Sequence, residues 1–202
     1  MKKGKFIVFD GIDGAGKTTQ LDMLARRMMD DGESVYITAE PTGRDIGRLL
    51  RSALSGAEKR SECEMAVMFV LDRIAHNAEI EEKINDGVCV LCDRYYHSTL
   101  AYQGKTTDYA WVRSMNIDCP EIRKPDACIY LDLTPEQSLK RISRGRSNVE
   151  IYENLEKLTE VRASFHSVIE DLRQNGEKIF IIDADRSKEE LAEEIYAVIK
   201  QL

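Results

Sequence analysis

Short apolar runs alternate with stretches of helical periodicity along the whole chain. Five runs have the length and composition of buried strands, at residues 6–9, 34–39, 88–92, 127–133 and 178–183. Apolar residues at helical spacing fill the intervals, at residues 17–31, 46–54, 62–85, 109–117, 136–143, 150–175 and 188–201, and an aromatic segment at residues 95–103 suggests one further helical turn. The alternation predicts an α/β fold in which a five-stranded parallel sheet carries helices on both faces.

Polar segments follow three of the predicted strands. They are the glycine-rich segment after the first strand, the turn that begins at Glu40, and the pair Asp93-Arg94. Ligands of open parallel sheets bind beyond the carboxyl ends of the strands. The three segments are therefore predicted to converge on one cleft.

The glycine-rich segment, residues 11–18, fits the pattern G-x-x-x-x-G-K-[ST] between a predicted strand and a predicted helix. Its glycines let the backbone wrap a phosphate chain, and N–H groups at the helix N-terminus face the anion. Lys17 is suited to the β- and γ-phosphates, and Thr18 offers its hydroxyl to Mg²⁺. An ordinary glycine-rich turn is the alternative. The flanking elements favour nucleoside triphosphate binding by Gly11, Ile12, Asp13, Gly14, Ala15, Gly16, Lys17, Thr18 and Thr19.

Asp93 and Arg94 indicate the chemistry at the end of the third strand. A carboxylate there, in a protein whose glycine-rich segment is a phosphate-binding loop (P-loop), is suited to help hold Mg²⁺ directly or through water. A hydrolytic ATPase would be expected to offer a second carboxylate next to it to orient water, but this chain offers Arg94. A guanidinium cannot act as a base near neutral pH, whereas it binds an oxyanion in a bidentate fork. The pair predicts an anionic acceptor such as a second phosphate; a surface ion pair is the alternative.

Two further sets of residues leave alternatives open. Phe69 and Arg73 share one face of a predicted helix, where an aromatic plate and a cation suit a base and its phosphate; spacing alone favours a core Phe69 and a solvated Arg73. The segment 141–148 carries Arg141, Arg144 and Arg146 with a glycine. It is interpreted either as a lid whose arginines neutralise charge on a transferring phosphoryl group, or as an ordinary basic surface loop.

Composition limits the class of protein. A net charge of −7 over 202 residues argues against a nucleic acid polymer as partner, so nucleotide-binding arginines and lysines must be concentrated locally. No repeat, low-complexity tract or linker interrupts the chain, which predicts a single domain over residues 1–202 with a mobile lid near residues 141–150.

Cysteine usage and the N-terminus indicate a cytoplasmic location. The five cysteines are odd in number and irregularly spaced, as expected for free thiols in a reducing compartment. Cys89 and Cys92 form a C-x-x-C inside a predicted strand, where they point to opposite faces, so two core thiols are favoured over a metal or redox pair. The first apolar run is four residues long, too short for a signal peptide or a membrane span.

Several motifs together resemble the thymidylate kinase (dTMP kinase) family. They are FDGIDGAGKTTQ, the EPTG turn, FVLDR at residues 69–73, DRYYHSTLAYQG at residues 93–104, KPDACIYLDLTPEQSLKR at residues 124–141 and IIDADRSKEEL at residues 181–191. The segment DRYYHSTLAYQ is the most specific of them, and the resemblance covers nearly the whole chain. It implies a P-loop nucleoside monophosphate kinase fold, ATP and dTMP as substrates, Mg²⁺ as cofactor and a homodimer, for which the helix at residues 62–85 is the expected interface.

The resemblance also implies roles for individual residues. The dTMP-binding residues are Asp13, Glu40, Arg51, Phe69, Arg73, Arg94, Ser98, Thr99, Tyr102 and Gln103. Among them Phe69 stacks on thymine, Arg73 reaches the base and phosphate, and Arg51 and Arg94 grip the acceptor phosphate. Tyr102 packs where a ribose 2′-hydroxyl would lie, which favours a deoxynucleotide. The catalytic residues are Lys17, Arg94, Asp13, Arg144 and Arg146, and the metal is held by Thr18 and Asp93.

The chain departs from parts of that family at two points. Some members carry an arginine inside the P-loop, where this chain has Gly14 and Ala15 at the variable positions. Members that lack it take the catalytic cations from the lid, which implies this role for Arg144 and Arg146. Thr99 stands where other members have Asn, Ser or Gly, so the contact with the base is left open.

The function expected from the sequence is direct in-line transfer of the ATP γ-phosphoryl group to the 5′-phosphate of dTMP. A first alternative is a kinase of another nucleoside monophosphate, such as dUMP. A second is a nucleotide-binding switch without catalytic activity, although the chain contains no N-K-x-D motif for reading guanine. A third is a plain NTPase, for which added dTMP would make no difference to ATP turnover.

Overall fold

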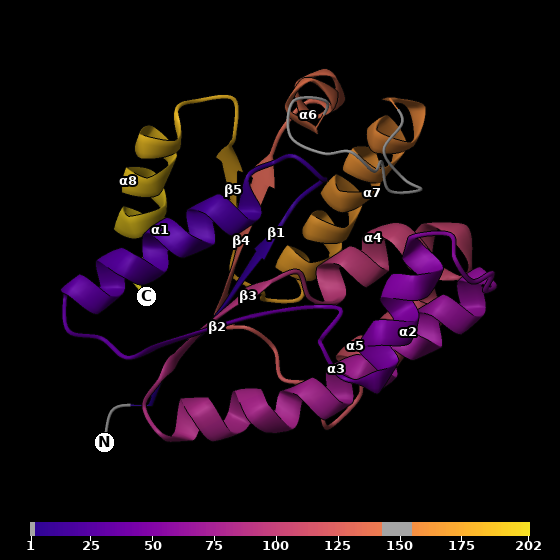
Figure 1. Cartoon of the computed structure of the whole chain (residues 1–202), viewed down its shortest axis with the longest axis horizontal. Coiled ribbons are helices and arrows are strands. Elements are labelled where there is room, and N and C mark those ends of the chain that lie inside the picture. Colours follow the sequence, from indigo (N-terminus) through magenta and orange to yellow (C-terminus); the bar gives the residue numbers. More distant parts are fainter. Residues whose placement is uncertain (1–2, 143–154) are drawn as a thin grey trace.

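A computed structural model of the protein describes residues 3–142 and 155–202. Its centre is a parallel sheet of five strands in the order β2-β3-β1-β4-β5 (Figure 1). The strands are β1 (Phe6–Asp10), β2 (Val35–Ala39), β3 (Cys89–Asp93), β4 (Ala127–Asp132) and β5 (Ile179–Asp183). All pairings are parallel, so the predicted fold class is confirmed.

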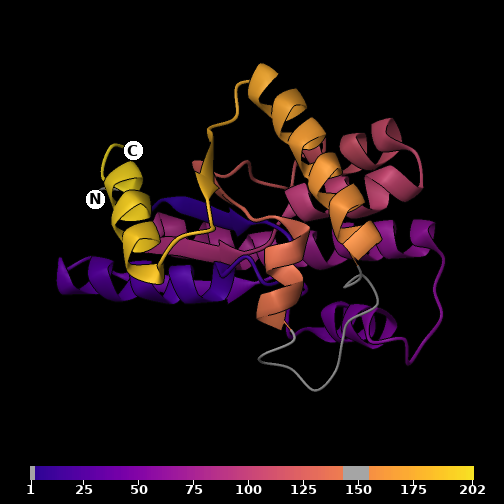
Figure 2. The ribbon, with the colours of Figure 1, turned by 90° about the horizontal axis from the view of Figure 1, so that it is seen from above.

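Helices cover both faces of this sheet, as Figure 2 shows from above. Apolar residues of α1 and α8 pack on one face, and those of α3, α4, α5 and α7 pack on the other. The described helices are α1 (Lys17–Asp30), α2 (Asp45–Leu54), α3 (Glu62–Asn85), α4 (Tyr96–Thr106), α5 (Tyr109–Ile117), α6 (Pro135–Ile142), α7 (Leu155–Gln174) and α8 (Lys188–Ile199). The helical turn expected at residues 95–103 is a helix of 11 residues, and the part of the predicted helix at residues 150–154 lies outside the described residues.

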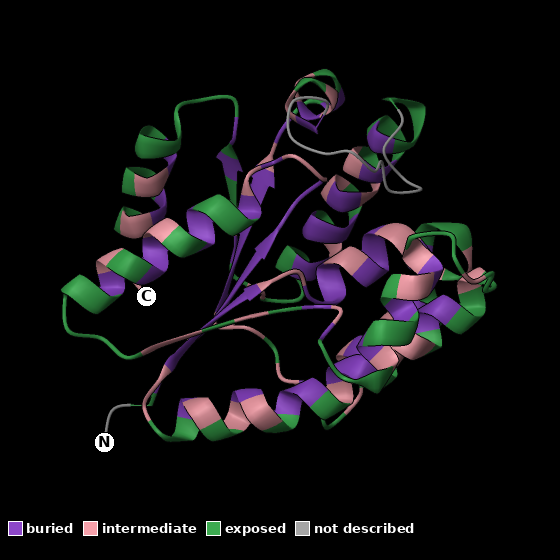
Figure 3. Ribbon diagram, in the orientation of Figure 1, coloured by how far each residue is buried: buried purple, intermediate pink, exposed green. Residues whose placement is uncertain are grey.

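Both faces of the central strands are buried, which explains their continuous apolar runs (Figure 3). Phe6 and Val8 belong to the core on the α3 side, whereas Ile7 and Phe9 belong to the core on the α1 side. Cys92 and Cys89 divide in the same way. Their opposite orientation is confirmed.

The topology forms a crevice between β1 and β3. These strands are neighbours with Phe9 opposite Asp93, and the Arg94 N–H donates to the Phe9 carbonyl at 2.8 Å. The helix that follows β1 packs on one face of the sheet, and the helix that follows β3 packs on the other. Adjacent strands whose chains leave in opposite directions open a crevice at their carboxyl ends, where ligands of such sheets bind.

No helix within residues 3–142 and 155–202 combines the length and the apolar character that a bilayer span needs.

Candidate active site

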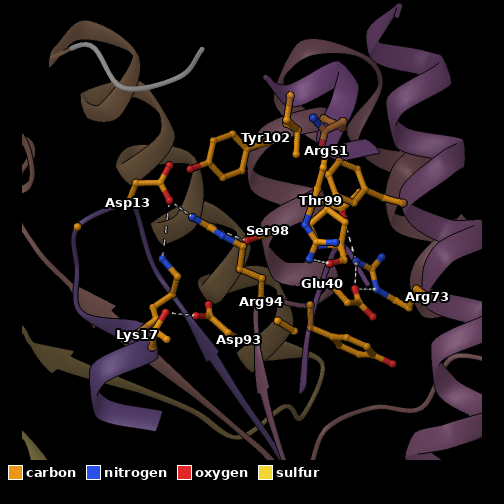
Figure 4. Close-up of a pocket in the computed structure, with 18 of the residues that line it drawn as sticks. Asp13, Lys17, Glu40, Arg51, Arg73, Asp93, Arg94, Ser98, Thr99 and Tyr102 are labelled. Atoms are coloured by element: carbon orange, nitrogen blue, oxygen red, sulfur yellow. Dashed lines mark hydrogen bonds and ion pairs between the residues drawn. The ribbon is translucent and has the colours of Figure 1, made fainter. Parts of the chain in front are cut away.

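A cavity of about 700 Å³ lies beyond the carboxyl ends of β1, β2 and β3 (Figure 4). The predicted residues that line it are Asp13, Gly14, Gly16, Lys17, Thr18, Thr19, Glu40, Arg51, Phe69, Arg73, Asp93, Arg94, Ser98, Thr99, Tyr102 and Gln103. The P-loop, the Glu40 turn and the Asp93-Arg94 pair therefore meet, as their positions after three strands predict. In the close-up, Lys17, Asp13 and Asp93 form one group and Glu40, Arg73 and Thr99 another, with Arg94 between them.

Lys17 lies at the first position of α1, directly after Gly16. Its Nζ donates to the carbonyls of Gly11 and Ile12, at 3.1 Å each, and lies 4.0 Å from an oxygen of Asp13. Burial and the nearby positive charge of Arg94 lower the pKa of Lys17. The cap residue Gly16 offers no side chain to the first N–H groups of the helix, which leaves them available to an anion.

The P-loop is packed against α6 at Gly14. This glycine has a φ of +74°, and a Cβ there would lie 3.0 Å from the Ser138 carbonyl oxygen and 3.2 Å from Ile142 Cγ1. The Ser138 hydroxyl also donates to the Asp13 carbonyl. A side chain at Gly14 would therefore press on α6, which would have to shift by a few tenths of an ångström. Ile12 and Ala15 pack into the two cores, so only their backbones can serve a ligand.

Thr18 and Asp93 meet across the base of the cavity. The Thr18 hydroxyl donates to Asp93 Oδ2 at 2.7 Å. A hydroxyl and a carboxylate in contact, beside a phosphate-binding loop, are groups of the kind that can hold Mg²⁺ together with substrate phosphates and water. The described residues contain no group of three or more His, Cys, Asp and Glu side chains able to hold a metal ion.

Arg94 is the cation between the two groups of residues. Its φ of 70° is positive, a conformation that costs energy for a residue with a side chain and that persists where the surroundings fix it. The guanidinium donates to Ser98 Oγ at 2.9 Å, to the Gly11 carbonyl at 3.2 Å and to Asp13. Burial by itself lowers the pKa of Arg94, but the negative charges of Asp13 and Asp10 outweigh burial and raise it.

Asp93 and Arg94 therefore use different partners, and the alternative of a simple ion pair between them is wrong. Asp10, the last residue of β1, supports this arrangement although it is fully buried. Its carboxylate accepts from the Ser98 hydroxyl at 2.7 Å and from the Gly11 N–H at 2.9 Å, and it lies 3.7 Å from Arg94. It thus connects the P-loop to the start of α4.

Arg73 is buried at the opposite end of the cavity, with 1% of its surface exposed, so the alternative of a solvated side chain is wrong. Its Nε donates to Glu40 Oε2 at 2.9 Å, and its Nη2 lies 2.7 Å from the same oxygen and donates to Thr99 Oγ1 at 3.1 Å. Nη1 donates to the Asn116 side-chain oxygen. All three nitrogens are engaged, which fixes the guanidinium and leaves one N–H on Nη1 for a ligand.

The remaining predicted acceptor residues line the cavity around Arg73. Arg51, on α2, donates to the carbonyls of Pro41 and Thr42 and is thereby tied to the Glu40 turn. Phe69 is half-buried on the α3 face that packs against α2. Burial raises the pKa of the Tyr102 hydroxyl, which keeps it protonated at neutral pH.

Arg141 is the described member of the three basic residues expected in the lid. It donates to the Ala184 carbonyl at 2.8 Å and more weakly to the Gly14 carbonyl at 3.5 Å. The Arg141 side chain thus lies against the backbone of the P-loop. Arg144 and Arg146, and most of the lid expected near residues 141–150, lie outside the described residues.

The hydrophobic pattern did not predict several buried polar residues that support the site. On α3, Asp72 accepts from the Thr42 N–H at 2.7 Å, and His76 Nδ1 lies 3.0 Å from Glu40 Oε1. On α5, Asn116 is fully buried against Arg73. Asp72 stands next to Arg73 in sequence and His76 one turn beyond Asp72, so helical spacing from Arg73 is the signal that could have found them.

A phosphate-binding loop and a second polar subsite in one cavity, at the switch point of a parallel sheet, define the class of P-loop nucleotide kinases. A family model for thymidylate kinase matches residues 9–195. The chain belongs to the thymidylate kinase family.

Similar proteins agree with this membership. A probable thymidylate kinase of Methanococcus aeolicus is 40% identical over 95% of this chain and 93% of its own length. A probable thymidylate kinase of Pyrococcus horikoshii is 35% identical over 98% of this chain and 97% of its own length. Among solved structures, thymidylate kinase from Candida albicans superposes with a TM-score of 0.84 over 98% of this chain and 92% of its own; at 20% identity this likeness concerns the fold.

Proposed function

We propose that the protein transfers the γ-phosphoryl group of ATP to the 5′-phosphate of dTMP and releases dTDP. The observation that carries this proposal is the arrangement of the cavity. The P-loop forms one end, the fixed Arg73 lies at the other, and Arg94 stands between them. ATP and dTMP are the substrates that family membership favours.

The reaction needs positioning and charge neutralisation more than a base. The oxygen of a phosphate acceptor is already nucleophilic, so direct transfer proceeds without a covalent enzyme intermediate. Lys17 and the N–H groups of the P-loop hold the donor phosphates, and Asp13 orients Lys17 and Arg94. Arg94 stabilises charge on the oxygens between donor and acceptor.

Recognition of dTMP is divided between two sets of side chains. One N–H of Arg73 remains for a ligand, which suits a single carbonyl oxygen of the base. The acceptor phosphate then falls to Arg94 and Arg51. Phe69 stacks on the base, Thr99 and Gln103 complete its pocket, and Tyr102 excludes a ribose 2′-hydroxyl.

Mg²⁺ is the cofactor of the proposed reaction, held by Thr18 and Asp93 together with substrate oxygens. The contact between these two side chains fits such a site. When bound, the ion neutralises charge on the β- and γ-phosphates. We further propose a single domain over residues 1–202, with a mobile lid near residues 141–150 whose Arg144 and Arg146 supply the cations that the P-loop lacks at Gly14 and Ala15.

A panel of nucleoside monophosphates with ATP and Mg²⁺ tests the function. dTMP is expected to be the fastest acceptor, with dUMP slower. Faster turnover of dCMP, UMP or AMP would overturn the assignment. ATP hydrolysis that is indifferent to all monophosphates would instead indicate a plain NTPase.

We also propose that the protein is a cytoplasmic homodimer joined through α3. Val67 and Leu71, one turn apart on this helix, are 38% and 49% exposed, so an apolar strip faces outward. A second copy that presents the same strip would bury it symmetrically.

Sedimentation should give a dimer for the wild-type protein and a monomer for Leu71→Glu. Ile181→Glu, at an exposed apolar position on the edge strand β5, serves as the control and should remain dimeric; a dimeric Leu71→Glu would refute the interface.

A further inference from the structure

Alternate residues of β2 and of the turn after it are joined to α3 by a series of polar contacts. The Tyr36 hydroxyl donates to Glu79 at 2.6 Å, and the Thr38 hydroxyl lies 2.8 Å from His76 Nε2. Glu40 contacts both His76 and Arg73, and the Thr42 hydroxyl and N–H donate to Asp72. Every second residue of a strand points to the same side, and residues three to four apart in a helix share one face. One face of α3 therefore contacts four alternate residues, at positions 36, 38, 40 and 42.

His76 is the member of this series that acts on the acceptor site. It is 1% exposed and is outside the described lining of the cavity. Its Nδ1 lies 3.0 Å from Oε1 of Glu40. The other oxygen of that carboxylate, Oε2, receives Arg73. Of the residues that His76 contacts in the described hydrogen bonds, Glu40 is the one that lines the cavity.

The chemistry of the contact fixes the ring. An ionised carboxylate accepts hydrogen bonds and cannot donate them, so Nδ1 of His76 carries a proton. The Thr38 hydroxyl can donate to an unprotonated Nε2 or accept from a protonated one, so it satisfies the far side of the ring in either state. The ring is thus held between β2 and the Glu40 turn.

Arg73 depends on Glu40 for its orientation. Two of its nitrogens contact Oε2, and the direction of the remaining Nη1 N–H follows from this contact. Without a donor on Oε1, the Glu40 carboxylate is held through Oε2 and Arg73, and both groups can turn together about the terminal torsion of Glu40, which is broad for a carboxylate. Arg73 would then lose its fixed direction although it keeps its charge.

We propose that His76 is a positioning residue for the monophosphate subsite, which orients Glu40 and through it Arg73. This inference rests on the proposed function, because it assigns the Arg73 end of the cavity to the acceptor. The proposal gives this role to His76 and not to Glu79. Glu79 belongs to the same series of contacts, but none of its described hydrogen bonds or ion pairs involves Glu40 or Arg73.

Steady-state kinetics of the full-length protein test the proposal. His76→Leu should raise the KM for dTMP about tenfold, because it strips a hydrogen bond from a buried charge, while the KM for ATP stays near the wild-type value. His76→Asn keeps an N–H near the place of Nδ1 and should recover most of the loss. Tyr36→Phe removes a neighbouring contact of the series and should leave both KM values unchanged.

Three results would overturn the role. The first is an unchanged KM for dTMP in His76→Leu. The second is an equal rise of the KM for dTMP and the KM for ATP in that variant, and the third is an equal effect of Tyr36→Phe, since either would indicate a merely structural contact. If His76→Leu does not fold, Thr38→Val takes its place: it removes the contact to Nε2 of His76 and should raise the KM for dTMP but not that for ATP, and an unchanged KM for dTMP would overturn the role.

A second measurement is independent of turnover. Imidazole ¹⁵N shifts of the wild-type protein, with the His76 signals assigned through His76→Asn, should give a protonated Nδ1. An unprotonated Nδ1 would refute the proposal. If the wild-type protein does not phosphorylate dTMP, the proposed function fails by itself, and the same variants are then compared on the monophosphate that is turned over.

Discussion

The Thr18 hydroxyl donates to Asp93 Oδ2 at 2.7 Å, although 75 residues separate the two positions. One residue belongs to the first turn of α1 and the other ends β3. The contact exists because β1 and β3 are neighbours in the sheet. It joins the nucleotide-binding loop to the strand that carries Arg94.

Asp93→Asn is expected to raise the Mg²⁺ concentration required for half-maximal activity by about tenfold or more, since an amide oxygen carries no net charge for the ion. Initial rates against free Mg²⁺ at saturating substrates measure the effect. Thr18→Ser keeps the hydroxyl and serves as the control. An unchanged Mg²⁺ requirement in Asp93→Asn would remove that residue from the metal site.

Arg94→Ala is expected to lower kcat by about 10²–10³-fold, the usual loss when one preorganised donor to a transition-state oxygen is removed. Single-turnover kinetics measure this, and circular dichroism monitors the fold. Arg113→Ala is the matched control, because Arg113 is also half-buried and paired with a carboxylate, that of Asp171, but does not line the described cavity. Near-normal turnover of Arg94→Ala would contradict the assignment.

Replacement of both Arg144 and Arg146 by alanine should lower kcat by about 10³-fold, in the range that arginines provide in phosphoryl transfer, with little change in the KM for dTMP. Arg141→Ala is tested beside it. A double variant of normal activity would mean that the catalytic cation comes from elsewhere, and a large loss in Arg141→Ala alone would assign it to α6.

Lys17 gives a stability prediction with a defined sign. Burial lowers its pKa below the ordinary value of 10.5, so between the two pKa values the unfolded chain binds more protons and stability rises with pH. The destabilising contribution is complete below the folded-state pKa and disappears as the pH approaches the unfolded value. Urea unfolding from about pH 7 to about pH 10 should therefore give a free energy of unfolding that rises for the wild-type protein relative to Lys17→Met. A falling difference would contradict the direction of the shift.

Gly14→Ala isolates the contact between the P-loop and α6. The substitution places a side chain at positive φ, which costs about 1–2 kcal/mol, and also presses Cβ against Ser138 and Ile142. Gly32→Ala shares the positive φ but has nothing within 4 Å, so it reports the backbone cost alone. The Gly14 variant should be less stable than the Gly32 variant by about 1–3 kcal/mol in urea unfolding. Equal losses would mean that α6 yields without cost.

The sequence was sufficient for the sheet because both faces of the central strands are buried and their apolar runs are continuous. It was sufficient for the P-loop because the Gly11–Thr18 motif acts through backbone geometry that glycine positions encode locally. The β2–α3 contacts were harder to predict. Asp72 and His76 interrupt the hydrophobic pattern of α3. They are buried because they bond to β2 and the turn after it, and residue spacing within α3 does not show these partners.

The structure was also needed to decide whether Arg73 is solvated or buried. Spacing alone favoured a solvated Arg73, because a charged side chain is rarely buried without partners. Its partners Glu40, Thr99 and Asn116 come from three other segments of the chain, so the sequence of α3 by itself does not predict them. The family resemblance, rather than the periodicity, pointed toward the cavity.

The position of β1 has a consequence for how the chain folds. It precedes the other four strands of the sheet in the sequence, yet its partners are β3, where Val90 lies opposite Phe6, and β4, where Ala127 lies opposite Ile7. One edge of β1 has no partner until β3 at residues 89–93 has been synthesised, and the other has none until β4 at residues 127–132 follows; such non-local pairing slows folding. ATP cannot act as a template for the early nascent chain, because the loop that binds it is held by strands that do not yet exist. We therefore expect nucleotide to stabilise the completed protein rather than to guide its synthesis.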